Sequence, residues 1–74
     1  MDNYHLVRDG EEWKLRKQGA DRSALVSDTK KDAVDESAKF MRRHGGSLKI
    51  HGEDGRIQEE RTYPRSADPP ESPG

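Results

Sequence analysis

The chain has no cysteine, few aromatic residues and no long apolar run, and each absence excludes a class of protein. Without Cys among its 74 residues, it has neither a disulfide framework nor a Cys-ligated zinc site. Hydrophobic residues make up only 27% and aromatic residues 5%, so a domain of this size has a thin core. Met1 is followed by Asp2 and Asn3 rather than by a basic and then apolar segment. We therefore expect no signal peptide, no membrane span and, by default, a cytoplasmic location.

Charge is abundant but balanced. Charged residues make up 39% of the chain, and 14 Lys and Arg against 15 Asp and Glu give a net charge of -1. A nucleic-acid-binding domain often has a strongly basic balance. Here only a local separation of charge could provide a basic surface.

Residues 3–16 alternate as a β-hairpin does, with Asp9-Gly10 as a type I′ turn. This turn places Leu6 opposite Trp13 and Tyr4 opposite Leu15. The apolar face then consists of Tyr4, Leu6, Trp13 and Leu15, and the other face of Asn3, His5, Val7, Glu12, Lys14 and Arg16. Beyond Gly19-Ala20, residues 23–27 are long enough for a short third strand.

A helix is predicted from Asp28-Thr29 to the stop at His44-Gly45-Gly46. Thr29 and Asp32 have the spacing of a capping box, with Asp where Glu or Gln is usual. Acids near the start and basic residues near the end suit the helix dipole. The spacing of one helical face is followed by Ala33, Val34, Ser37, Ala38, Phe40 and Met41, and this face should cover the apolar side of the sheet.

Residues 48–60 predict a second hairpin, whose register is chosen by its apolar pattern. A turn at Asp54-Gly55 would set Ile50 against Glu59, whereas a loop centred between Glu53 and Asp54 sets Ile50 against Ile57. We favour the second register, in which Leu48, Ile50 and Ile57 join the core. The opposite face would then carry Lys49, His51, Arg56 and Gln58.

These elements predict an α+β domain over residues 1–63. It is a small antiparallel sheet of two hairpins, with the order β-β-(β)-α-β-β and one helix on its apolar face. Residues 64–74 hold all four prolines and nothing apolar larger than Ala67. We expect this Pro-rich end to be a disordered tail, since it cannot bury enough surface to offset its ordering entropy.

Several segments resemble domain-of-unknown-function family 2188. They are the Trp13-x-Leu15 strand ending in Gly19-Ala20, the Thr29-x-x-x-Ala33 helix start, and the hairpin His51-Gly52-x-Asp54-Gly55-Arg56-Ile57-x-Glu59, with Thr62-Tyr63 after it. The resemblance covers nearly the whole chain. It implies this architecture and a small uncharacterised protein of a bacterium, an archaeon or a phage, and it implies no reaction.

No catalytic, cofactor or metal site is predicted. His5, His44 and His51 are the strong neutral-pH proton carriers, and their predicted positions do not converge. The chain lacks the His-x-x-x-His spacing of a metal site. Paired acids such as Glu11-Glu12, Glu53-Asp54 and Glu59-Glu60 fall in turns and on strand edges, where carboxylates are usually solvated. We therefore expect no enzyme.

Two binding hypotheses remain. The thin core and unpaired outer strands favour a non-catalytic protein-interaction or self-association module, such as a homodimer. The alternative is a nucleic-acid-binding module that uses the open face of the sheet. In either case the predicted contact face consists of His5, Lys14, Arg16, Lys49, His51 and Arg56.

Overall fold

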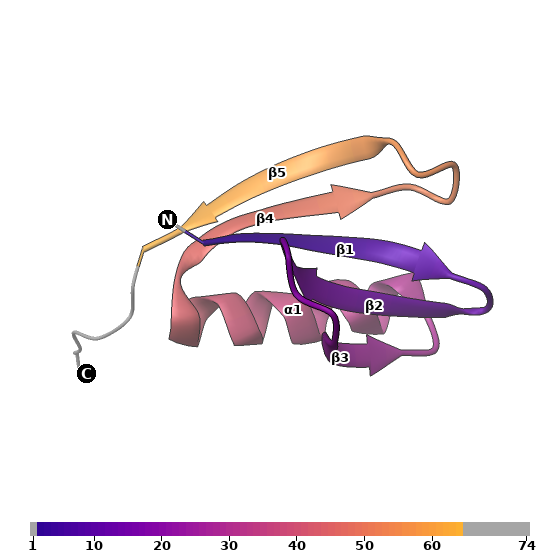
Figure 1. Cartoon of the computed structure of the whole chain (residues 1–74), viewed down its shortest axis with the longest axis horizontal. Helices are drawn as coiled ribbons and strands as arrows, with labels where there is room; N and C mark the ends of the chain where they lie inside the picture. Colours follow the sequence, from indigo (N-terminus) through magenta and orange to yellow (C-terminus); the bar gives the residue numbers. More distant parts are fainter. Residues whose placement is uncertain (1, 65–74) are drawn as a thin grey trace.

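In the part of the chain that the structure describes, two hairpins and a short third strand form one five-stranded sheet, with a single helix on one face (Figure 1). This computed structural model describes residues 2–64. The elements in chain order are β1 (Asn3–Asp9), β2 (Glu12–Lys17), β3 (Ser23–Ser27), α1 (Lys30–His44), β4 (Gly46–His51) and β5 (Ile57–Tyr63). The predicted α+β class, element order and short third strand are confirmed. Except for Pro64, the predicted tail lies outside the described residues.

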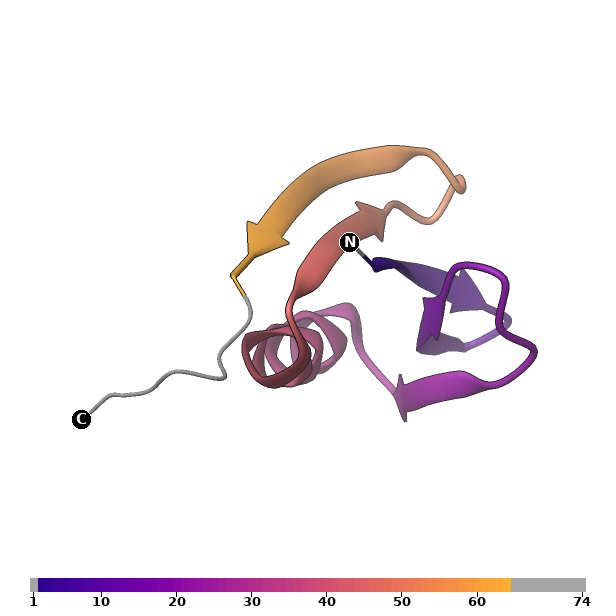
Figure 2. The same cartoon turned by 60° about the vertical axis from the view of Figure 1, so that its left-hand side comes forward.

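The two hairpins meet through β1 and β4, which run parallel in the sheet order β3-β2-β1-β4-β5. The sheet is therefore mixed and not antiparallel throughout: this one pair is parallel, and the other strand pairs are antiparallel. The helix is the crossover that returns the chain to the middle of the sheet, beside β1. Figure 2 shows the sheet curving around the helix, which packs against β1, β2, β3 and β4.

The first hairpin turns one residue later than predicted. Gly10 and Glu11 form the turn, so Leu6 lies opposite Leu15 and Arg8 opposite Trp13. The backbone explains the difference, because Gly10 has φ +68° whereas no non-glycine residue between residues 2 and 64 has a positive φ. This pattern fits a type II′ turn with Gly first, not a type I′ turn at Asp9-Gly10. The predicted pairs were wrong. Moving the turn by one residue shifts each pairing partner on β2 by two positions, so every side chain stays on its predicted face.

The helix begins and ends where the sequence predicted. Thr29 Oγ1 accepts a hydrogen bond from the Asp32 N–H at 3.1 Å, which satisfies one free donor of the first turn. At the other end Gly45 has φ +74° and donates its N–H to the Met41 carbonyl at 2.7 Å. The buried helical residues are Ala33, Ser37, Ala38 and Met41, with Val34 and Phe40 packed partly against the core.

The second hairpin adopts the register that the apolar pattern argued against. Ile50 lies opposite Glu59, and a bulge then places Ile57 opposite His51. Leu48 and Ile50 are buried as predicted, but Ile57 is 47% exposed, so its predicted place in the core was wrong. The loop explains this outcome: Gly55 has φ +87° and donates its N–H to the Gly52 carbonyl at 3.0 Å. The turn geometry decides the register. The helix does not cover this part of β5, so an Ile57 side chain that faced inward would gain little burial.

Candidate functional site

The sheet face opposite the helix is here called the open face. It carries part of the predicted contact face. Arg16 of β2, His5 of β1 and Lys49 of β4 lie in one row across neighbouring strands. The row continues to Glu60 of β5, which lies opposite Lys49. The three central strands thus present two cations, one on each side of a histidine, and the row ends in an acid.

Several of these cations have partners within the sheet. Lys14 Nζ lies 2.9 Å from Asp9 Oδ2, and its hydrogen bond and charge lower the pKa of the Asp9 carboxyl. Lys49 Nζ donates to Asn3 Oδ1 at 2.6 Å and to Ser47 Oγ at 3.0 Å. The open face is therefore a mixed polar surface with local positive charge, not a continuous basic patch.

Arg56 does not belong to this face. It lies in the loop before β5, its side chain is 88% exposed, and its Nε is 3.9 Å from Asp54 Oδ2. Gln58 was also expected on the open face, but the bulge turns it toward the helix, where Gln58 Oε1 accepts from Lys30 Nζ at 2.7 Å. Both deviations follow from the corrected register of the second hairpin.

Two of the three histidines meet on the open face, which the sequence did not predict. His5 Nδ1 and His51 Nε2 lie 2.9 Å apart, with ring centroids at 5.1 Å and ring planes at 49°. They meet because β1 and β4 are parallel neighbours, and the hairpins considered separately gave no such pairing. The third, His44, stacks on Phe40 at the end of the helix with centroids 4.1 Å apart.

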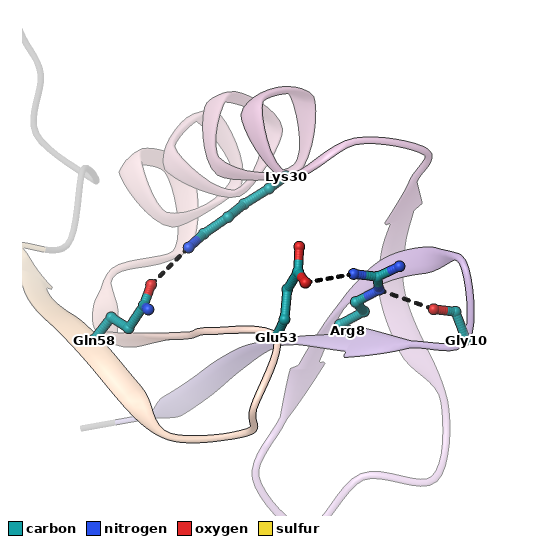
Figure 3. Close-up of polar contacts among 5 residues, drawn as sticks. All are labelled: Arg8, Gly10, Lys30, Glu53 and Gln58. Atoms are coloured by element: carbon teal, nitrogen blue, oxygen red, sulfur yellow. Dashed lines mark hydrogen bonds and ion pairs between the residues drawn. The ribbon is translucent and has the colours of Figure 1, made fainter.

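Two of the three acidic pairs, Glu53-Asp54 and Glu59-Glu60, contribute to local ion pairs. Glu53 Oε1 lies 3.0 Å from Arg8 Nη1 (Figure 3), and Glu59 Oε2 lies 2.5 Å from Arg61 Nε. Across residues 2–64, no group of three or more His, Cys, Asp or Glu side chains is placed to hold a metal ion.

A groove of about 270 Å³ between β3 and the helix is lined by Ala24, Leu25, Glu36, Lys39, Phe40, Arg43 and His44.

The outer strand β5 is the least covered element of the fold. Residues 57–60 are exposed, and only Arg61 and Tyr63 are half-buried. A hydrogen bond with Arg61 lowers the pKa of Glu59, and the same bond raises the pKa of Arg61. Figure 3 shows two contacts that hold this hairpin to the body, Lys30 to Gln58 and Arg8 to Glu53. The strand is therefore anchored at its start although its surface is open.

The comparisons with known proteins bear on the family and leave the activity open. Within the described residues, no helix is both long and apolar enough to cross a membrane. Neither curated proteins nor solved structures give a match. A family model described as "Uncharacterized protein conserved in bacteria (DUF2188)" matches residues 4–63, which is most of the chain. The chain belongs to this uncharacterised bacterial family.

Proposed function

We propose that this protein is a small non-catalytic interaction module that self-associates through the outer edge of β5. The observation that carries the proposal is the state of β5 itself. It is seven residues long, it lies at the end of the sheet, and most of it is exposed. The outer N–H and C=O groups of such a strand can pair with another chain.

The charges of β5 favour a second copy as the partner. In a two-fold symmetric antiparallel pair whose axis is perpendicular to the sheet, one residue lies opposite its own copy. If that residue is Glu60, all seven residues are paired and Glu59 lies opposite Arg61 of the second copy, twice. Cross-strand pairs of opposite charge contribute roughly 0.2–1 kcal/mol each. The Glu59–Arg61 contact within one chain would be exchanged for the same contact between chains.

The same register has one unfavourable feature, which makes it testable. The two Glu60 side chains would face each other on the open face, and like charges directly opposite are destabilising. Lys49, which lies opposite Glu60 in the sheet, offsets part of this repulsion. Glu60→Gln should therefore strengthen self-association.

The test is light scattering across a dilution series of the wild type and of charge variants. Arg61→Glu and Glu59→Arg should each weaken the dimer, because each sets like charges opposite one another. The double variant should restore it, and a mixture of the two single variants should form a heterodimer. Lys31→Glu on the exposed helix surface is the control and should leave the mass unchanged. A wild type that is monomeric at every concentration contradicts self-association. A dimer whose stability is unchanged by these charge variants contradicts an interface at the β5 edge.

A second candidate function, nucleic-acid binding, is supported by the row formed by Arg16, His5 and Lys49. Neutralising Arg16 and Lys49 to Gln should lower affinity for DNA or RNA and reduce the salt slope by about one unit per lost phosphate contact. Arg56→Gln is the matched control, because that side chain lies off the face. No salt-dependent affinity of the wild type at about 50 mM salt, where phosphate contacts are strong, contradicts this candidate.

A further inference from the structure

We propose that His5 and His51 form a two-histidine binding site for a divalent transition metal with ligands at right angles, such as Ni²⁺. The rings come from the two central parallel strands, β1 and β4. His5 Nδ1 and His51 Nε2 face each other at 2.9 Å. Strands paired in the middle of a sheet hold such side chains in place, so little ordering is needed on binding.

The outer nitrogen of each ring is already held by an oxygen. His51 Nδ1 lies 2.7 Å from the Gly55 carbonyl, which can only accept, so the hydrogen resides on Nδ1. A neutral His51 therefore presents the lone pair of Nε2 to His5. Metal-bound histidines usually have this arrangement, in which the second ring nitrogen donates to a carbonyl or similar acceptor.

His5 repeats the arrangement from the other side. Its Nε2 lies 3.3 Å from Gln18 Oε1, and donation to that oxygen would free the lone pair of Nδ1 for a metal ion. Without a metal, His5 Nδ1 donates its hydrogen to the lone pair of His51 Nε2 at 2.9 Å, as an N–H···N hydrogen bond. A metal ion that replaces this hydrogen bond uses both inner nitrogens as ligands and lies to one side of the line that joins them, and the His5 hydrogen moves to Nε2, where Gln18 Oε1 can accept it.

The separation of the nitrogens indicates which metals fit. Imidazole nitrogens bind metals at roughly 2.0–2.1 Å, so two ligands at a right angle are separated by about 2.9 Å and two tetrahedral ligands by about 3.4 Å. The observed 2.9 Å matches the right angle. Octahedral Ni²⁺ and tetragonal Cu²⁺ have such ligand pairs, and tetrahedral Zn²⁺ requires the rings to move apart.

The surroundings set the strength of the site. Arg16 and Lys49 flank His5 in its row, and their positive charges oppose a bound cation. Since no third His, Cys, Asp or Glu joins the pair within residues 2–64, water would complete the coordination. Affinity should therefore rest on the two rings together, so the loss of either ring removes most of it.

The experiment is a titration of the full chain with NiCl₂. Calorimetry measures the affinity, and paramagnetic broadening of amide NMR signals locates the bound ion. Broadening should centre on residues 5 and 51 at one ion per chain. His5→Gln and His51→Asn each keep a donor for the outer oxygen and delete the inner nitrogen, and each should weaken binding at least tenfold. His44→Asn is the matched control and should bind like the wild type. Bound Ni²⁺ should also raise the Tm of the wild type but not of His51→Asn.

A second pair of variants tests the outer contacts without touching the ligands. Gln18→Glu supplies a stronger acceptor to His5 and a negative charge, so it should tighten binding, and Gln18→Leu should weaken it a few-fold. The proposal is overturned if the His5 and His51 variants bind Ni²⁺ as the wild type does. Equal loss in His44→Asn, or broadening centred elsewhere, also overturns it. None of these readouts depends on self-association.

Discussion

The two hairpins have the same construction but different surroundings. Both strands of the first lie under the helix, and Leu6, Trp13 and Leu15 are at most 4% exposed. In the second, Leu48 and Ile50 of β4 are buried, whereas β5 is held mainly by its pairing with β4. A hairpin thus places two strands together, but the helix decides which strand contributes to the core. The strand left uncovered is the one that we propose pairs with a second copy.

Removing Trp13 should have the largest effect on stability, because this side chain fills the helix-covered half. Trp13 is 4% exposed and Lys30 Nζ lies 5.5 Å from its ring centroid. Trp13→Ala should cost about 3–5 kcal/mol of unfolding free energy, a large share of what a small domain has. Chemical denaturation with fluorescence-independent detection, such as circular dichroism, measures this. An unshifted cooperative transition would contradict the core described here.

Gly46→Ala tests the junction where the helix passes into β4. Gly46 has φ +126°, and a Cβ there would lie 2.5 Å from the Asp2 carbonyl oxygen. We expect a loss of about 1–3 kcal/mol from overpacking. Gly10→Ala is the matched control, since Gly10 has φ +68° but nothing within 4 Å of its Cβ position. Equal losses in the two variants would show that the close approach to Asp2 is unimportant.

Ser37→Ala should stabilise the protein by about 1 kcal/mol. Ser37 is fully buried under the sheet, and its Oγ has no hydrogen-bond partner among the described residues. A buried polar group without a partner costs about 1–3 kcal/mol, and Ala removes it with little change of volume. Thermal denaturation should show a higher Tm. A lower Tm would mean that the hydroxyl has a bonding role.

Ile57→Thr should change stability by less than about 0.5 kcal/mol, as is usual for exposed positions. The side chain is 47% exposed on β5, and Thr keeps the β-branch that suits a strand. The comparison with Trp13→Ala therefore measures how unequally the helix covers the two hairpins. A loss of several kcal/mol would place Ile57 in the core after all.

The smallest expected effect concerns Asp9, whose pKa is lowered chiefly by its hydrogen bond from Lys14. Because the folded-state pKa lies below the unfolded one, this contribution is present above the unfolded pKa. It is lost as the pH falls through the folded value. Lys14→Gln should raise the pKa of Asp9 toward its ordinary value of 3.8, as followed by NMR titration of the carboxyl. An unchanged pKa would show that the ion pair does not persist in solution.

The predictions of the helix ends succeeded, whereas the predicted turns of both hairpins were wrong. The Thr29 cap and the stop at Gly45 depend on neighbouring backbone groups, and both were predicted. In the second hairpin, the apolar pattern and the turn residues favoured different registers, and the turn around Gly55 prevailed. The meeting of His5 and His51 required the order of the strands. A helix between strands favours a parallel crossover, and this signal could have placed β4 beside β1.

By itself the sequence determined the element order, the helix ends and the faces of the first hairpin, because alternation and caps act within a few residues. Tertiary structure decided which strand lies beside which, since strand neighbours come from distant parts of the chain. It brought His5 and His51 together, placed Arg16, His5 and Lys49 in one row, and left most of β5 uncovered. One helix of 15 residues does not cover the whole face of a curved sheet of five strands, and the outer edge of β5 is open because β5 is the last strand of the sheet.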